Sequence, residues 1–439
     1  MPRPHATFPP EYDERCRRTL DLALDQLPAY RPWRVRDPGP ERPVDERYAA
    51  LPATTKALIR EHFPRGIVFP GRNLEEGVAG GEVELVHTSG TTEERVTTIW
   101  HQAWWNASER ASWKLNSHAA ALATGSQKEA LLSSPMSVGV RCDSGYLEVE
   151  ARTQGRFLFL NEKPDPSAWT APHVDRMADE IDAFQPVTLE ANPSYLARFC
   201  RHIADRDGSV AKPALIVLTF EFPSRLHLRQ IRRVFPDVPV FSSYGSTETG
   251  YVLTQCEAGR FHQNAESCRL DFVPLEPARG AAGIVRMLVT PFGHPWYSLL
   301  RFDVADAARI GAGAPCPCGR NSGHVLLSLE GRVRDMTLTP EGRAVTVNEL
   351  DAAMGGVNGV FIYELRQTSA GAYRLRVVAD RGASGDLPAA ARAALETVYG
   401  PRATIDVAVE PDFPPEPSGK YRLARMMFPF DVDQLFERG

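Results

Sequence analysis

Short apolar runs alternate with amphipathic stretches through the middle of this chain, and that alternation restricts its fold more than any other feature. Residues 82–90 (EVELVHTSG) predict a strand that enters a glycine-containing turn, and residues 214–220 (ALIVLTF) predict a buried strand. Residues 224–235 carry apolar side chains near helical spacing, and residues 239–248 (PVFSSYGSTE) predict another strand followed by a turn. Strands that alternate with helices indicate an α/β fold with mostly parallel sheets.

The composition and the pattern both change toward the C-terminus. Residues 312–323 are rich in Gly, Pro and Cys, and the segments beyond Gly331 suggest a small α+β unit of about 100 residues, which is within the usual size of a domain. We therefore predict a large α/β N-terminal domain, residues 1–330, and a small α+β C-terminal domain, residues 331–439. Residues 31–52 are rich in Pro, Arg and Asp, which predicts an irregular loop.

Charge and composition exclude several classes of protein. The 439 residues are 43% hydrophobic, so the chain can bury a large core without disulfides. A formal net charge of -5 gives no electrostatic reason to expect nucleic-acid or membrane partners.

No stretch approaches the roughly 20 apolar residues of a spanning helix, and the N-terminus lacks the apolar run of a secretory signal. We therefore expect a soluble, cytoplasmic protein. The seven cysteines favour reduced thiols or metal ligands over a disulfide framework.

A turn rich in hydroxyl groups follows the first predicted strand. It consists of Thr88, Ser89, Gly90, Thr91 and Thr92. The glycine allows the backbone to approach an anion closely, and hydroxyl and backbone N–H groups can hold a polyphosphate. The turn is therefore a candidate phosphate loop, although the same residues also suit an ordinary polar turn. It lacks the ending of a G-x-x-x-x-G-K-[ST] loop, which disfavours a standard P-loop NTPase fold.

The turn resembles the phosphate loop of the adenylate-forming superfamily, which comprises acyl-CoA synthetases, peptide-synthetase adenylation domains and luciferases. That loop is roughly T-S-G-T-T-G-x-P-K, and this sequence matches it through Thr92. Glu93 and Val96 replace the usual glycine and final lysine. Glu93 and Glu94 form an acidic pair, which is electrostatically unfavourable near phosphates. Arg95 is one possible source of the missing positive charge. The effect of these departures on activity stays open.

A second match to the superfamily follows the strand predicted at residues 239–243. It consists of Ser243, Tyr244, Gly245, Ser246, Thr247 and Glu248. The resemblance implies that the segment binds ATP, with Tyr244 stacked on adenine, Thr247 at a phosphate and Glu248 on the Mg²⁺ that bridges ATP oxygens. A hard cation favours a carboxylate, and the phosphoryl charge needs neutralising. Taken alone, the segment also suits a turn at the end of a strand.

Two further matches follow in the order that the superfamily has. The segment that ends at Asp306 resembles the one whose last aspartate binds both ribose hydroxyls, a role that suits the two oxygens of a carboxylate. The alternative is a structural ion pair between Arg301 and either Asp303 or Asp306. Residues 331–335 resemble the hinge between the two domains, which implies that Arg332 contacts the nucleotide. Arg334 replaces the first acidic residue of that hinge, so its behaviour as a hinge stays open.

The last match lies near the C-terminus. Residues 416–422 (EPSGKYR) resemble the P-x-G-K segment of the superfamily, which implies that Lys420 reaches the reacting carboxylate and the α-phosphate. Lysine suits this role because it is a compact, mobile point charge. The resemblance also implies that the C-terminal domain is mobile and rotates between adenylation and acyl transfer. A solvated surface lysine is the alternative.

Three cysteines and a histidine flank the predicted nucleotide site. Cys316 and Cys318 form a Cys-x-Cys pair in a Gly/Pro turn, and Cys256 and His262 follow the Tyr244 segment. If the two loops are adjacent, three thiolates and an imidazole form a closed tetrahedral set for structural zinc. Free buried cysteines are the alternative, and Cys268 is a weaker fifth candidate.

The resemblance implies an enzyme that activates a small carboxylic acid with ATP. The acid and ATP would give acyl-AMP and pyrophosphate, and an acceptor, most often coenzyme A, would then take the acyl group. The modest length and compressed C-terminal part resemble the phenylacetate–CoA ligase-like branch, which implies an aromatic or similarly compact acid. An amine or a carrier protein is the alternative acceptor, and an inactive nucleotide-binding regulator is the alternative from another class. Candidate pocket segments are residues 134–141, 220–223 and 243–250.

Overall fold

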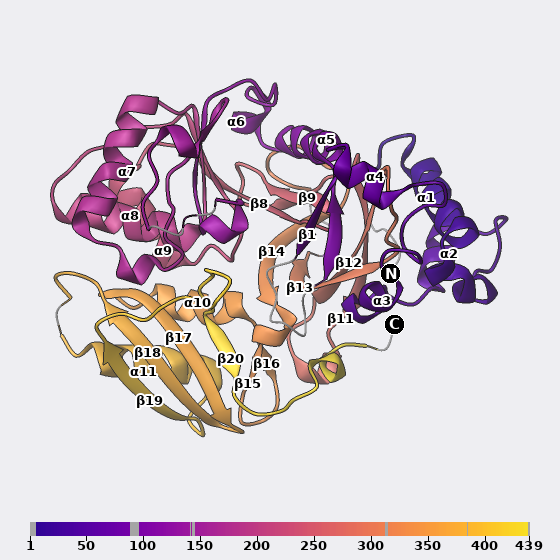
Figure 1. Cartoon of the computed structure of the whole chain (residues 1–439). Coiled ribbons are helices and arrows are strands. Elements are labelled where there is room, and N and C mark those ends of the chain that lie inside the picture. The colour runs from indigo at the N-terminus through magenta and orange to yellow at the C-terminus, as the bar shows by residue number, and fades with distance from the viewer. Residues whose placement is uncertain are drawn as a thin grey trace.

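A computed structural model describes most of the chain, namely residues 6–87, 96–140, 142, 145–311, 315–383 and 385–437. Its strands form a twelve-stranded sheet, a four-stranded sheet and two hairpins (Figure 1). No helix within the described ranges is both long enough and apolar enough to cross a membrane.

The N-terminal region is helical. Its elements are α1 (Tyr12–Gln26), the 3-10 helix η1 (Pro28–Val35), α2 (Val44–Ala49), α3 (Lys56–His62) and α4 (Leu74–Ala79). The expectation of an irregular loop over residues 31–52 is therefore wrong in part, because η1 and α2 lie within it. Tyr30, Trp33 and Tyr48 are buried against α1 in one hydrophobic cluster. Large aromatic side chains at a few positions are enough to order a segment that its proline content marks as a loop.

One half of the large sheet is mainly parallel and confirms the α/β prediction. Its strands are β4 (Thr153–Gln154), β5 (Phe157–Phe159), β3 (Glu129–Leu132), β6 (Thr188–Ala191), β7 (Leu215–Leu218) and β8 (Val240–Ser246), in spatial order. All neighbours from β5 to β8 run parallel, and β4 is antiparallel to β5. The helices of this half are α7 (Ala171–Phe184), α8 (Pro193–Asp205) and α9 (Arg225–Val234). The strand and the helix expected over residues 214–235 are both confirmed as β7 and α9.

The other half of the large sheet is antiparallel. It continues from β8 through β9 (Gly250–Gln255), β10 (Phe261–Gln263), β14 (Val325–Arg332), β13 (Phe302–Ile310), β12 (Ile284–Pro291) and β11 (Cys268–Pro274). Every neighbouring pair here is antiparallel, so the expectation of mostly parallel strands is wrong for this half. Several of these strands follow one another through connections too short for a crossover helix, and such connections join antiparallel neighbours.

Smaller elements accompany the large sheet. They are the hairpin β1 (Glu84–His87) and β2 (Thr97–Trp100), the helices α5 (Gln102–Trp113) and α6 (Ser117–Ala120), and the 3-10 helices η2 (Pro135–Ser137), η3 (Glu150–Arg152), η4 (Pro166–Ala168) and η5 (Pro277–Arg279). The short strand expected near residues 82–90 is confirmed as β1.

The C-terminal part has its own sheet and core. Its strands pair in the order β19 (Thr404–Glu410), β18 (Ala372–Ala379), β17 (Val360–Ser369) and β20 (Ala424–Met426). It also contains η6 (Val333–Asp335), the hairpin β15 (Thr337–Leu338) and β16 (Ala344–Val345), α10 (Val347–Gly355), α11 (Leu387–Tyr399) and η7 (Val432–Leu435). The buried cluster here takes only Leu226 from the preceding part of the chain. A division near residue 331 agrees with this separate core, and the domain limits stay a prediction.

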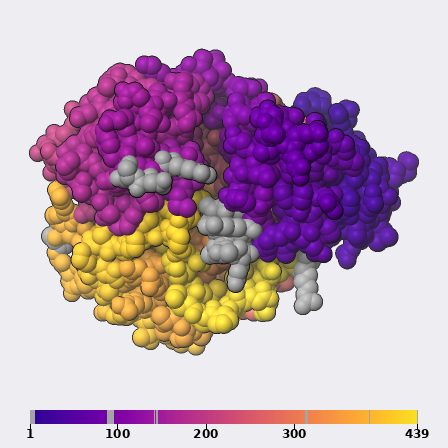
Figure 2. Space-filling model, viewed as in Figure 1, coloured from indigo at the N-terminus to yellow at the C-terminus, as the bar shows by residue number. Residues whose placement is uncertain are grey.

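The N-terminal and C-terminal parts are joined by polar contacts, by apolar contacts and by the end of the chain. Figure 2 shows the C-terminal part, coloured orange to yellow, packed against the magenta region that contains α8 and α9. Gln230 on α9 donates to Asp380 at 2.6 Å, and the N–H of Arg225 donates to Asp351 on α10 at 2.8 Å. Phe436 returns to the large sheet and pairs with Leu275 beside β11. Ala197 of α8 also packs with Phe361 and Tyr421 in one buried cluster, so the interface combines hydrogen bonds with apolar contacts.

Candidate active site

The predicted site residues meet where β8, β13 and β14 approach the C-terminal loop. The hydroxyl of Tyr244 donates to Oδ2 of Asp306 at 2.8 Å. Asp306 and Arg332 are paired residues of β13 and β14. The charges of Asp306, Glu248 and Arg332 all act on the ammonium of Lys420. Side chains from four separate segments therefore share one electrostatic environment.

The β8–β9 hairpin fixes the segment predicted to bind ATP. A Cβ on Gly245 would lie 2.3 Å from the carbonyl oxygen of Gly250, so only glycine fits this close approach. Ser246 Oγ lies 2.9 Å from Thr249 Oγ1 across the turn. The carbonyl oxygen of Glu248 accepts a hydrogen bond from the Tyr297 hydroxyl at 2.8 Å. The turn, which also includes Thr247, is therefore held in a single shape. The roles of Glu248 at Mg²⁺ and of Thr247 at phosphate stay predictions.

The Tyr244–Asp306 contact depends on local backbone geometry. Burial raises the pKa of the Tyr244 hydroxyl well above its ordinary value, and the nearby Asp306 carboxylate acts in the same direction. The hydroxyl therefore stays protonated and donates. Ala305, at the position where the superfamily has glycine, has a φ of 59°, in the region that favours glycine. Its N–H donates to Asp303 at 2.9 Å, which helps to hold this unusual conformation.

Lys420 lies in a compact turn that rests on the N-terminal part. Within the turn, the Gly419 N–H donates to Glu416 at 2.8 Å, and the Glu416 N–H donates to the carbonyl oxygen of Lys420 at 2.9 Å. Gly419 has a φ of 79°, and a Cβ there would lie 2.4 Å from Ser134 Oγ and 2.9 Å from Tyr195 Oη. We call residues 416–421 the lysine loop. Its close fit against Ser134 and Tyr195 depends on glycine.

The electrostatics of Lys420 suit a mobile cation in a site for anions. Burial lowers the pKa of its ammonium to about 8, and Arg332 acts in the same direction. Glu221, Asp306 and Glu248 oppose this shift. A lysine that is surrounded by both signs of charge can keep its own charge near neutral pH and present it to a substrate phosphate.

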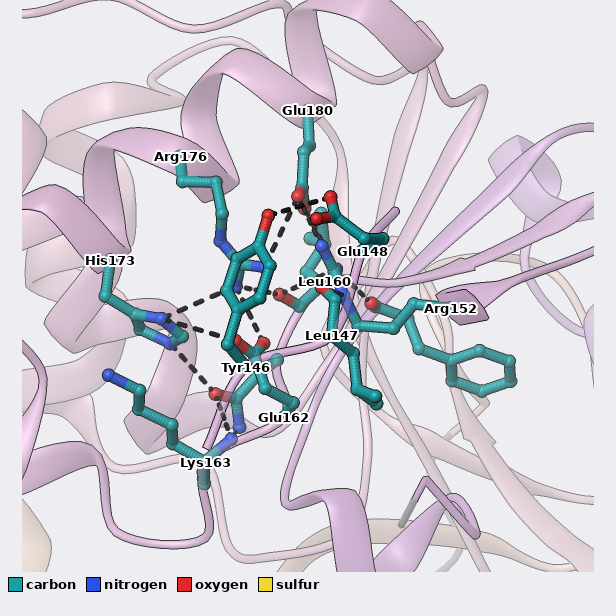
Figure 3. Close-up of polar contacts among 12 residues, drawn as sticks. Tyr146, Leu147, Glu148, Arg152, Leu160, Glu162, Lys163, His173, Arg176 and Glu180 are labelled. Atoms are coloured by element: carbon teal, nitrogen blue, oxygen red, sulfur yellow. Dashed lines mark hydrogen bonds and ion pairs between the residues drawn. The ribbon is translucent and has the colours of Figure 1, made fainter. Parts of the chain in front are cut away.

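A buried ionic network surrounds the segment that follows β5 and joins it to α7 (Figure 3). Arg152 is 1% exposed and forms an ion pair with Glu180. His173 Nε2 lies 3.2 Å from Asn161 Oδ1, and Asn161 donates to the carbonyl oxygen of Ser133 at 2.9 Å. Burial lowers the pKa of His173 to about 3, so the ring stays neutral. The network therefore fixes the end of β3 just before the serine that contacts Gly419.

Sequence reasoning missed how the lysine loop is held. Glu221 accepts a hydrogen bond from the Tyr421 N–H at 3.0 Å, and Arg198 donates to the Tyr421 hydroxyl at 3.2 Å. Glu221 fell only within a candidate pocket segment, and Arg198 was not singled out. No local signal marks either residue, because Tyr421 is 200 and 223 positions away from them along the chain.

Part of the predicted site lies outside the described residues. This applies to Thr88, Ser89, Gly90, Thr91 and Thr92, and also to Arg141 at the end of one candidate pocket segment. A cavity of about 490 Å³ lies between α9, β8 and the turn after β9. Its lining includes Phe222 and Pro223 of one candidate pocket segment and Cys256 of the predicted metal set, but none of the residues predicted to bind ATP.

Four metal-type donors meet at one end of the antiparallel half. Cys256 Sγ lies 3.6 Å from Cys316 Sγ, and Cys318 Sγ lies 3.4 Å from His262 Nε2. All four donor atoms lie within 4.8 Å of one another. A zinc ion about 2.3 Å from each sulfur in tetrahedral geometry would separate two sulfurs by about 3.7 Å. The donor types and their spacing therefore fit zinc. We call these four residues the Cys/His cluster.

The protonation of His262 and the membership of the cluster also fit a metal. Burial lowers the pKa of His262 to about 4, so the imidazole is neutral, as a metal ligand must be. The weaker candidate Cys268 is not a member, because its buried thiol donates to the carbonyl oxygen of Asn264 at 3.6 Å.

Comparisons with known proteins show the fold. Neither a family model nor a curated protein matches the sequence. A 2-hydroxyisobutyryl-CoA ligase in the postadenylation state, in complex with 2-HIB-AMP, gives a TM-score of 0.71 at 16% identity over 96% of this chain and 90% of its own. The anthranilate CoA ligase AuaEII, in complex with anthranoyl-AMP, gives 0.52 at 12% identity over 77% and 65%. The amide bond synthetase McbA from Marinactinospora thermotolerans gives 0.51 at 14% identity over 78% and 67%. The chain therefore has the fold of adenylate-forming ligases.

The 2-hydroxyisobutyryl-CoA ligase matches in more than one state. In its thioesterification state, with 2-HIB-AMP and CoA, the 2-hydroxyisobutyryl-CoA ligase gives a TM-score of 0.55 at 17% identity over 96% of this chain and 92% of its own. At equal coverage of this chain, the score is higher for the postadenylation state. The arrangement of this chain is therefore nearer to the postadenylation arrangement.

Proposed function

We propose that this chain is an AMP-forming carboxylate ligase of the acid–CoA ligase type. It activates a small carboxylic acid as acyl-AMP, releases pyrophosphate and transfers the acyl group to coenzyme A. The observation that carries the proposal is the convergence of Lys420, Glu248, Asp306 and Arg332 in a fold shared with ligases that hold acyl-AMP.

The chemistry follows from the charges at this site. An oxygen of the substrate carboxylate attacks the α-phosphorus of ATP, and the bond to pyrophosphate breaks. Both reactants are anions, so positive charge at the transferring group lowers the barrier. The ammonium of Lys420 and the guanidinium of Arg332 supply that charge. The carboxylate of Asp306 accepts one hydrogen bond from Tyr244 and can accept further hydrogen bonds from the ribose hydroxyls. Mg²⁺ held by Glu248 would neutralise the departing pyrophosphate.

Two structural features would serve this reaction. We propose a structural zinc in the Cys/His cluster, where it would tie the turn after β9 to the loop after β13. We also propose that residues 331–439 form a mobile domain that rotates between the two half-reactions. The hydrogen bonds and ion pairs across the interface support rotation, because such contacts exchange with water at little net cost.

The proposal also specifies the class of acid and the class of acceptor. We place the chain in the phenylacetate–CoA ligase-like branch because of its length and compressed C-terminal part, and therefore propose an aromatic or similarly compact acid. Coenzyme A and ATP are both available in the cytoplasm, where we place the reaction. The likeness to the amide bond synthetase McbA favours one second candidate, an amide-forming adenylase that transfers to an amine.

Acid-dependent release of pyrophosphate tests the proposal. The protein is incubated with ATP, Mg²⁺ and a panel of aromatic and short aliphatic acids. Coenzyme A, amines or a carrier protein is then added to the acids that react. We expect release with at least one compact acid and a thioester product with coenzyme A. An amide product would select the second candidate. Binding of ATP without release for any acid would contradict both and favour an inactive regulator. Lys212→Ala is a matched control, because this exposed lysine lies outside the site.

A further inference from the structure

We propose that Glu221 is the positioning residue that holds the lysine loop in place for acyl-AMP formation. The inference rests on the proposed function and deepens it, because it assigns a residue that sets the arrangement of the two parts. Glu221 would not touch the substrate. It would act through the backbone next to Lys420.

The carboxylate of Glu221 joins the two parts of the molecule with one oxygen each. Its Oε1 accepts from the N–H of Ser194 at 2.8 Å, and its Oε2 accepts from the N–H of Tyr421 at 3.0 Å. Ser194 lies in the first turn of α8, and Tyr421 directly follows Lys420. Among side chains, only a carboxylate offers two oxygens that both accept hydrogen bonds and carry no proton. The residue type therefore matches a bridge between two backbone donors.

The surroundings of Glu221 favour this bridge over other roles. Burial raises the pKa of its carboxyl, so the charged form needs compensation. The hydrogen bonds from Ser194 and Tyr421 and the charge of Lys420 act in the opposite direction. The N-terminus of α8 also favours a negative charge. Without the lysine loop, one oxygen of this carboxylate would lose its donor, and the carboxylate would lose the effect of the Lys420 charge.

The backbone before Glu221 is strained in a way that directs its side chain. Phe220 has a φ of 73°, which is rare for a bulky residue. Its neighbour Glu221 donates through its own N–H to the carbonyl oxygen of Thr219 at 3.0 Å, so the chain turns sharply after β7. Such strain persists where surrounding contacts require it and is concentrated at functional sites. Here the turn points the carboxylate at both donors.

The bridge is suited to a contact that forms and breaks. Besides it, the lysine loop is held by the close packing of Gly419 and by the bond from Arg198 to the Tyr421 hydroxyl. Of its side chains, only that of Tyr421 belongs to a buried apolar cluster, which also contains Ala197 of α8. If the C-terminal part rotates, the Tyr421 N–H can exchange Glu221 for water, and the bond can form again for the next adenylation.

Two substitutions separate the bridge from the other contacts. Glu221→Gln keeps the size but turns an NH₂ group toward one of the two backbone donors. Tyr421→Phe removes only the hydroxyl that Arg198 contacts and keeps the backbone N–H. Amide hydrogen exchange of the peptide that contains Tyr421 reports the bridge directly. Pyrophosphate release and transfer from a synthetic acyl-AMP report the two half-reactions, with kcat and the KM for ATP measured separately.

We expect Glu221→Gln to speed amide exchange in the lysine loop while β17 and β18 stay protected. We expect it to lower kcat of adenylation about tenfold to a hundredfold, the effect of losing a charged hydrogen bond, with a smaller change in KM and in acyl transfer. Tyr421→Phe should leave the amide protected and change adenylation less. Unchanged exchange in Glu221→Gln overturns the inference, and so does faster exchange with unchanged adenylation. Absence of adenylation in the unaltered protein would overturn the proposed function, whereas the exchange result would still report the bridge.

Discussion

The Cys/His cluster and the lysine loop are both assembled from distant segments, yet they are held in different ways. The cluster joins loops of the same antiparallel half-sheet, and its four donor atoms lie within 4.8 Å of one another. The lysine loop belongs to a part with its own core and reaches the large sheet through one tight glycine contact and a few hydrogen bonds. This difference is the one expected if the cluster is the proposed structural element and the lysine loop is the proposed reversible contact.

The two regions also differ in how they depend on domain arrangement. Every donor of the cluster lies within residues 256–318, so rotation of the C-terminal part would leave it intact. The charges of Asp306 and Glu248 act on Lys420 in the present arrangement, which is nearer to the postadenylation state of a ligase with the same fold. Changes to the lysine loop should therefore alter one half-reaction, and changes to the cluster should alter stability.

The largest expected effect is that of Lys420→Ala. It should lower acyl-AMP formation about a hundredfold to a thousandfold, because a charge contact to the transition state is lost. Transfer from a synthetic acyl-AMP should be largely unaffected. Both half-reactions are followed separately, beside Lys212→Ala. Equal losses in both would indicate misfolding or general binding, and no loss would indicate a solvated lysine.

Glu248→Gln should have the next largest effect. We expect adenylation to fall about tenfold to a hundredfold, since the amide keeps the shape but removes the negative charge that would hold Mg²⁺. The melting temperature should change little, and higher Mg²⁺ should restore part of the rate. Glu266→Gln, at an exposed glutamate outside the site, is the control. Unchanged pyrophosphate release would remove the assignment of Glu248 to the metal.

Removal of zinc should destabilise the protein without changing the balance of half-reactions. We expect about one zinc per chain by metal analysis of protein purified without chelator, on the basis of the ligand count. Chelation or Cys316→Ser should lower the melting temperature by several degrees, because bound metal stabilises the folded state. Cys268→Ser should not lower the zinc content. Absence of zinc in the unaltered protein would contradict the proposal.

The smallest expected effect is a pH dependence of adenylation. Lys420 has a pKa of about 8, so its charged fraction falls as the pH rises through that value. The adenylation rate should therefore decline above about pH 8, by about half at the pKa. Lys420→Arg keeps its charge throughout this range and should be slower but should lack the decline. A decline of the same shape in both proteins would assign it to another group.

Sequence pattern was sufficient for features that depend on nearby residues. The apolar run of β7 and the helical spacing of α9 report burial directly, since side-chain periodicity follows the local backbone. The Tyr244, Asp306, Arg332 and Lys420 segments were recognised from residue types and order, and the structure brings them together. The Cys/His cluster was likewise predicted from donor types and from the position of both pairs beside the predicted nucleotide site.

Tertiary structure decided what depends on partners far along the chain. Strand direction in the antiparallel half follows from pairing between segments, which apolar runs do not encode. The helices within residues 28–49 form because a few aromatic side chains reach a cluster with α1. Glu221 is one acidic residue among many in the sequence, and only folding places its two oxygens between donors 27 and 200 positions away. Residue type limits the chemistry that a side chain can perform, whereas long-range packing determines which partner it meets.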